Sequence, residues 1–128
     1  MTPGGDPAML TALSFTGCRL SSRALLVLTT CANREEADDL ATALVEARLA
    51  ACVNRLDGVG STFLWHSKLE RDEETLVLIK TTEDRFAALE LAIRDRASYE
   101  LPEVIAVPVH RGSAEYLDWL EESVADKD

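Results

Sequence analysis

A strand that leads into an acidic helix start occurs twice in this chain, and this repeat constrains the fold more than any other feature. Residues 25–30 read Leu-Leu-Val-Leu-Thr-Thr, and residues 77–82 read Val-Leu-Ile-Lys-Thr-Thr. Short apolar runs that end at polar turn residues are typical of buried strands. A half repeat of this kind indicates a split β-α-β arrangement.

The segment after the first strand has the pattern of an amphipathic helix. Asn33 is placed to cap this helix, and Glu36 stands where a capping box has its acidic residue. The apolar residues that follow recur at helical spacing and predict one buried stripe, made of Ala37, Leu40, Ala41, Leu44, Val45 and Leu49.

Two extended segments come next, and we expect them to pair as a hairpin. Residues 50–53 are apolar, residues 57–60 contain two glycines that predict a turn or bulge, and residues 61–67 alternate in hydrophobicity. The charged residues 70–74 are expected at the hairpin tip. Residues 76–79 then form the second buried strand.

A second helix is predicted after this hairpin. Thr81 and Asp84 fit a second capping box, while Phe86, Leu89 and Ile93 supply the buried stripe. This helix should stop near Ala97.

The last strand and helix complete the pattern. Residues 103–109 read as a strand, and Pro108 cannot donate a backbone hydrogen bond, so this strand belongs at a sheet edge. Ser113 then caps a closing helix whose inward residues are Tyr116, Leu117, Leu120 and Val124.

The predicted order is β-α-β-β-α-β followed by one more helix. This is an α/β (α+β) chain of the ferredoxin-like class, with the helices on one face of the sheet. Exposed sheet edges favour pairing between subunits.

The chain has 128 residues, which is enough for one domain. We assign residues 24–128 to that domain and residues 1–23 to a flexible extension.

The net charge of −10 repels phosphate backbones and argues against a nucleic-acid partner. There is no apolar run of membrane-spanning length, and three cysteines without a C-x-x-C pair favour a reducing cytoplasm.

Few residues offer metal chemistry. Cys31 ends a strand just before a helix N-terminus, a position that favours the thiolate and therefore the binding of a soft metal. The alternative is that Cys31 is only a small side chain that fills the turn. Cys52 is expected in the core. His66 and His110 have no histidine neighbour at chelating spacing, and residues 70–74 are expected to form a solvated acidic face.

Six segments, in order, resemble the CutA family of divalent-cation tolerance proteins. They are residues 29–37, 49–54, 63–68, 78–82, 99–104 and 108–120. Within them stand Thr-Thr-Cys-Ala-Asn-Arg-Glu-Glu-Ala, Leu-Ala-Ala-Cys-Val-Asn, Phe-Leu-Trp-His-Ser-Lys, Leu-Ile-Lys-Thr-Thr and Tyr-Glu-Leu-Pro-Glu-Val. The resemblance covers essentially residues 24–124.

This resemblance implies a ferredoxin-like protomer in an interlocked homotrimer, similar in outline to the P-II signalling proteins. It implies a role in tolerance of copper and other divalent cations, binding of such metals, and no established catalytic activity.

The sequence departs from the family pattern at two places. Ala97-Ser98 occupy positions where the family usually has His-Pro, and His66-Ser67 replace a Gln or Glu followed by Gly.

The polar and aromatic residues most specific to the resemblance suggest a cleft between subunits. The resemblance and the residue types together give the candidate set Trp65, Lys68, Tyr99, Glu100, Glu103 and Trp119. Their aromatic members could equally be buried at a subunit interface without any ligand, and Lys68 and Glu103 could pair with each other. Cys31 and His66 are the candidate metal ligands.

Three function classes follow. The first is a non-enzymatic trimer that binds divalent metal, copper included. The second is a P-II-like regulatory trimer that holds a small effector between subunits. An acyl-phosphate hydrolase is disfavoured, because the turn at residues 29–34 has no glycine for a phosphate cradle and Ser113 has no neighbouring His.

Overall fold

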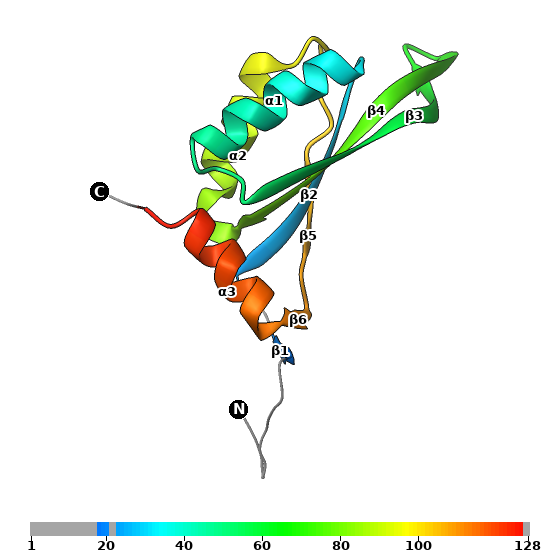
Figure 1. Cartoon of the computed structure of the whole chain (residues 1–128). Helices are drawn as coiled ribbons and strands as arrows, with labels where there is room; N and C mark the ends of the chain where they lie inside the picture. Colours follow the sequence, from blue (N-terminus) through cyan, green and yellow to red (C-terminus); the bar gives the residue numbers. More distant parts are fainter. Residues whose placement is uncertain (1–17, 21–22, 127–128) are drawn as a thin grey trace.

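The computed structural model describes residues 18–20 and 23–126. Four antiparallel strands form the main sheet in the order β3-β4-β2-β5 (Figure 1). The strands are β2 (Ala24–Cys31), β3 (Cys52–Trp65), β4 (Lys68–Thr82) and β5 (Ile105–Pro108). The helices are α1 (Arg34–Glu46), α2 (Phe86–Arg96) and α3 (Ala114–Ser123), with a short 3-10 helix at Glu83–Arg85. This order confirms the ferredoxin-like prediction.

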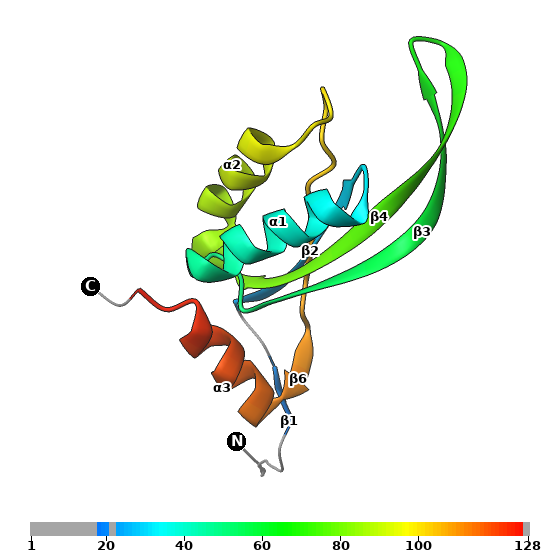
Figure 2. The ribbon, with the colours of Figure 1, turned by 45° about the horizontal axis from the view of Figure 1, so that its top comes forward.

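Helices α1 and α2 lie side by side over one face of the sheet (Figures 1 and 2). Alternate residues of the strands point toward them, because side chains along a strand alternate between faces. The resulting core includes Val27, Ile79, Leu44, Leu89 and Ile93, all essentially inaccessible to solvent. The predicted stripes of both helices are thus confirmed at their centres.

The end of the first stripe was predicted wrongly. Helix α1 ends at Glu46, and Arg48 turns the chain with φ of 60°. Val45 is 43% exposed on the outer side of the last helical turn, and Leu49 lies beyond the helix, only partly buried. The helical spacing of apolar residues continues in the sequence beyond the residue at which the backbone leaves the helix.

Two of the three predicted caps are confirmed. The Asn33 side chain accepts a hydrogen bond from the Glu36 amide, and the Ser113 hydroxyl accepts one from the Tyr116 amide. The box at Thr81 is wrong, because Thr81 is a buried strand residue whose hydroxyl donates to the Leu49 carbonyl at 2.7 Å.

The β3–β4 hairpin is confirmed, but its turn is not where the charges are. The strands pair from Cys52 opposite Lys80 to Trp65 opposite Lys68, so the turn is His66-Ser67. Both turn residues have positive φ, 53° and 64°, as a two-residue hairpin turn of type I′ requires. Residues 70–74 lie within β4, not at a tip.

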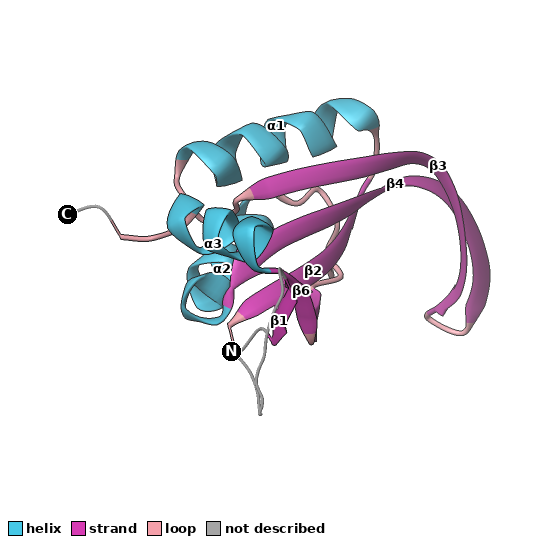
Figure 3. Cartoon of the chain, turned by 60° about the horizontal axis from the view of Figure 1, so that its bottom comes forward, coloured by secondary structure: helices cyan, strands magenta, loops and turns pink. Residues whose placement is uncertain are grey.

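The outer half of this hairpin, residues 59–74, is a curved arm that extends past the other strands (Figures 2 and 3). The predicted irregularity at residues 57–60 is present: the register shifts between Leu56 and Val59, and Gly58 has φ of 70°. A bulge bends and twists the strand that contains it, which accounts for the curl of the arm.

The sheet face away from α1 and α2 carries apolar side chains with little cover. Leu26 and Leu28 of β2 and Leu76 and Leu78 of β4 are only half-buried there. In β5, which is an edge strand as predicted, Ile105 and Val107 are about half exposed. We call this surface the helix-free face.

Helix α3 packs near the start of β2 through Leu117, Leu120 and the adjacent Val124, which are buried as predicted. Tyr116 was also expected to face inward, and this prediction is wrong. Its side chain is 42% exposed, and its hydroxyl accepts a hydrogen bond from Lys80 Nζ at 3.3 Å. The guanidinium groups of Arg48 and Arg85 donate to backbone carbonyls at the end of α3, at Ser123 and Val124.

The boundary between extension and domain stays a prediction, but three residues of the predicted extension form a strand. Cys18–Leu20, expected within the flexible extension, form strand β1, which pairs antiparallel with β6 (Arg111–Ser113). The edge of β6 offers unpaired backbone groups that such a segment satisfies. Residues 1–17 and 21–22 of that predicted extension lie outside the described residues, whereas Arg23 is described and pairs with Asp84 at 2.7 Å. In the described chain, no helix combines the length and hydrophobicity of a membrane span.

Candidate functional site

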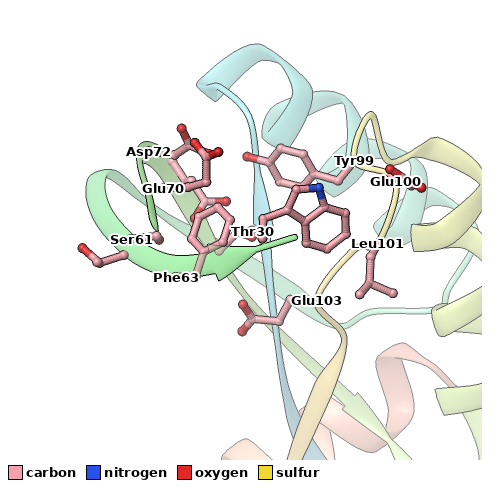
Figure 4. Close-up of a pocket in the computed structure, with 12 residues that line it drawn as sticks. Thr30, Ser61, Phe63, Glu70, Asp72, Tyr99, Glu100, Leu101 and Glu103 are labelled. Atoms are coloured by element: carbon pink, nitrogen blue, oxygen red, sulfur yellow. The ribbon is translucent and has the colours of Figure 1, made fainter. Parts of the chain in front are cut away.

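A cavity of about 550 Å³ lies between the arm and the segment that leads into β5 (Figure 4). Its walls come from β2, from both strands of the arm and from residues 99–103. The lining residues are Thr30, Ser61, Thr62, Phe63, Trp65, Glu70, Asp72, Glu74, Tyr99, Glu100, Leu101 and Glu103. A volume of this size is typical of small-molecule sites.

The arm supplies one wall through strand alternation. In β4, Glu70, Asp72 and Glu74 are two residues apart, so their side chains leave the strand on the same side. Phe63 pairs across the hairpin with Glu70, and Ser61 pairs with Asp72. Each carboxylate on this wall therefore has a neighbour from β3 on the same face.

The opposite wall is the segment from Tyr99 to Glu103, and Glu36 holds its beginning in place. Glu36 Oε2 accepts a hydrogen bond from the Ser98 amide at 3.0 Å, while Oε1 accepts one from the Ala32 amide at 2.7 Å. One carboxylate thus ties the start of α1 to the loop that carries Tyr99.

The cavity is negatively charged. Five carboxylates line it, and its lining among the described residues contains no lysine, arginine or histidine. Burial raises the pKa of the Tyr99 hydroxyl well above its ordinary value, and a hydrogen bond to Glu74 and the charges of Glu74, Glu36 and Asp72 raise that pKa further. The negative electrostatic potential of these carboxylates attracts cations to the cavity and repels anions.

Four of the six predicted cleft residues meet at this cavity. Trp65, Tyr99, Glu100 and Glu103 all line it, and a single chain brings them together without a second subunit. The other two do not. Lys68 is exposed beside the hairpin turn, and among the described residues no ion pair joins it to Glu103.

The sixth predicted residue, Trp119, lies elsewhere. It is 47% exposed on α3, and its ring centroid is 5.4 Å from that of Tyr116. It therefore belongs to the aromatic surface near Lys80, whose ammonium group lies 5.5 Å from the Tyr116 ring centroid.

The predicted metal ligands Cys31 and His66 are far apart in the chain. Cys31 pairs with Thr75 in the sheet and is buried under the helices, while His66 is in the hairpin turn. The stretch of β4 from Lys68 to Thr75 separates them by roughly 20 Å at the usual rise of a strand.

The environment of Cys31 also disfavours its thiolate. Burial raises the pKa of the Cys31 thiol to about 11, and the nearby charges of Glu36 and Glu74 act in the same direction. These effects oppose the influence of the α1 N-terminus, on which the prediction of a thiolate depends. Cys52, predicted in the core, is half-buried, and its sulfur is 4.0 Å from Asn54 Oδ1.

The part of the chain that the structure describes contains no group of three or more His, Cys, Asp or Glu side chains arranged to hold a metal ion. His110, like His66, is exposed. The described residues of one chain therefore do not fit a closed metal site of the kind that zinc or copper occupies in proteins.

Sequence reasoning missed part of the cavity wall. Phe63, Glu70, Asp72 and Glu74 line the cavity, although residues 70–74 were expected to be a solvated tip. The sequence did contain a signal for these residues. Glu70, Asp72 and Glu74 are spaced i, i+2, i+4, which places them on one face of a strand once the turn is assigned to His66-Ser67.

Comparison with known proteins agrees with this architecture. Residues 25–123 match the family described as CutA1 divalent ion tolerance protein. The divalent-cation tolerance protein CutA of Thermus thermophilus is 43% identical over 98 residues, which cover 77% of this chain and 95% of that protein. A crystal structure of CutA from Xylella fastidiosa superposes with a TM-score of 0.80 at 38% identity, covering 81% of this chain and 100% of that one.

Human protein CutA is 44% identical over 100 residues, which cover 76% of this chain. The match spans only 56% of the human protein's own length. The family match and the Thermus relative both cover about three quarters of the chain, including both strand-and-helix units and the cavity walls. The chain therefore belongs to the CutA1 family of divalent ion tolerance proteins.

Proposed function

We propose that this protein acts in divalent-cation tolerance as a non-catalytic homotrimer whose acidic cavity binds a cationic ligand. One observation carries the proposal: five carboxylates and three aromatic side chains line a single cavity, and none of the described lining residues is basic. Carboxylates that share a cavity repel one another, and a bound cation relieves that repulsion.

The helix-free face supports assembly. It presents Leu26, Leu28, Leu76 and Leu78 with little cover, beside Ile105 and Val107 at the open edge of β5. An apolar surface of this kind, next to an exposed strand edge, is typical of a subunit interface. We propose the cytoplasm as its compartment, since Cys18, Cys31 and Cys52 are all free.

Direct binding of copper or another divalent metal stays a prediction. The carboxylates of Glu70, Asp72 and Glu74 are hard donors that attract such ions, but they are not arranged as a closed metal site. A cavity of about 550 Å³ favours the second candidate, a P-II-like regulatory trimer that holds a small molecule. In both candidate functions, the metal-binding trimer and the regulatory trimer, the ligand of the cavity is a cation.

Two local observations argue against the alternative of an acyl-phosphate hydrolase. The segment between β2 and α1 has no glycine that could let backbone amides cradle a phosphate. The Ser113 hydroxyl is used as a helix cap.

A fluorescence titration tests the proposed function. The chain has two tryptophans, so Trp119→Phe leaves Trp65 as the only reporter, within the cavity wall. Copper chloride, magnesium chloride and 1,4-diaminobutane are titrated separately at low ionic strength, and sodium sulfate serves as the anion control.

The proposal expects saturable changes in Trp65 emission with at least one cation and none with sulfate. Glu70→Gln with Asp72→Asn should weaken the response. Glu46→Gln with Asp95→Asn changes the net charge equally at exposed positions outside the cavity and should leave the response unchanged. No saturation with any cation, or equal saturation in both double variants, would overturn the proposal.

A further inference from the structure

The spacing of the carboxylates on the arm limits what kind of cation fits. Glu70, Asp72 and Glu74 stand at alternate positions of one strand, so consecutive members of this row are about 7 Å apart at their backbones. Such a row matches a ligand with several positive charges spread along a line. It does not match one compact charge.

The second wall adds charge at a distance from this row. Glu100 and Glu103 belong to the segment before β5, across the cavity from the arm (Figure 4). The negative charge is therefore distributed around the cavity. Among the described residues, no three potential metal ligands converge on one point.

Aromatic side chains line the same cavity as the carboxylates. Phe63 is the cross-strand partner of Glu70, Trp65 follows two residues later on the same strand, and Tyr99 stands on the opposite wall. Aromatic faces attract alkylammonium groups and pack against methylene chains. A hydrated metal ion gains little from such walls.

We propose that the cavity binds a linear organic diamine or polyamine, whose ammonium groups pair with the carboxylates while its methylene chain packs on the aromatic walls. This inference rests on the proposed function, because it names the chemical class of the cationic ligand. The spacer of a four-carbon diamine is comparable in length to the separation of alternate residues in a strand.

Calorimetric titration of the full-length protein tests the class of ligand. At low ionic strength, 1,4-diaminobutane and spermidine are compared with butylamine, 1,4-butanediol, magnesium chloride and copper chloride. Both polyamines should bind, and butylamine, which has a single charge, should bind about tenfold more weakly than the diamine. The uncharged diol should give no binding.

Variants then connect binding to the cavity. Glu70→Gln with Asp72→Asn should weaken the binding of spermidine about tenfold. Trp65→Leu and Phe63→Leu keep an apolar wall and should each weaken it about threefold through the loss of cation–π attraction. Glu46→Gln with Asp95→Asn is the charge-matched control and should bind like the wild type. Light scattering on each variant shows whether assembly is retained.

The outcomes separate this inference from the proposed function. If magnesium or copper binds at the cavity carboxylates while the amines do not, the polyamine inference is wrong and the proposed function stands. If a second chain fills the cavity so that no cation binds, both are wrong. Amine binding that survives neutralisation of Glu70 and Asp72 also overturns the inference.

Discussion

The backbone amide of Ser98 donates a hydrogen bond to Glu36 Oε2 at 3.0 Å, at a position where the resemblance to CutA proteins leads one to expect a proline. A proline has no amide hydrogen, so this contact depends on the Ala97-Ser98 pair of this chain. It fixes the start of the cavity's second wall to the N-terminus of α1, because the same carboxylate also accepts from the Ala32 amide.

Ser98→Pro should lower the free energy of unfolding by about 1 to 2 kcal/mol, because the Glu36 carboxylate loses a donor. Ala97 already has ψ of 141°, the conformation that a residue before proline prefers, so steric conflict at that residue is not expected to add to the loss. Urea denaturation measures the change. Ser98→Ala keeps the amide and should match the wild type; an equal loss in both variants would contradict this account.

The hairpin turn predicts a stabilising substitution. His66 and Ser67 both have positive φ, which costs a residue with a side chain about 1 kcal/mol relative to glycine. Ser67→Gly should therefore raise the thermal midpoint, measured by calorimetry. Thr62→Gly, in the middle of the same arm, should lower it, because glycine weakens a strand interior. A lower midpoint for Ser67→Gly would show that the turn is not strained.

The raised pKa of Cys31 predicts a loss of stability in alkali. The thiol ionises near pH 9 in the unfolded chain but near pH 11 in the folded one, so the unfolded state releases its proton first as pH rises. The free energy of unfolding should fall between these values. Cys31→Ala should fall less steeply over the same range in urea titrations, and parallel curves for the two proteins would refute the assignment.

Much of the fold was predictable because local patterns decided it. The buried residues Val27, Ile79, Leu89 and Ile93 repeat at strand or helix spacing, and Asn33 and Ser113 cap their helices through contacts three residues away. Such features depend on neighbours in sequence.

The site was less predictable because it depends on backbone geometry at two points. The turn at His66-Ser67 has no glycine or asparagine to mark it, so the acidic residues next to it were placed at a tip. The bulge after Leu56 was expected, but the curl that it gives the arm decides which carboxylates face Tyr99. Cys31 differs from its prediction for a related reason: burial is the main cause that raises the pKa of its thiol, and a position before a helix does not reveal how deeply the thiol is buried.

The helix-free face should hold the assembly together. Leu78→Lys places a charge in the middle of that face, opposite Leu28, and should shift the protein from trimer to monomer in light scattering. Leu91→Lys changes a 62% exposed residue of α2 and should leave the mass unchanged. A wild-type mass equal to the 14.0 kDa of one chain would remove the proposed trimer altogether.

Native mass spectrometry with spermidine tests the central claim most directly, because it reports assembly and ligand binding in one spectrum. The account predicts a species of three chains that carries up to one spermidine per chain. The Glu70→Gln, Asp72→Asn variant should show the same three-chain species without ligand. A single-chain species, or spermidine retained on that variant to the wild-type extent, would contradict the claim that the acidic cavity of a trimer binds the cation.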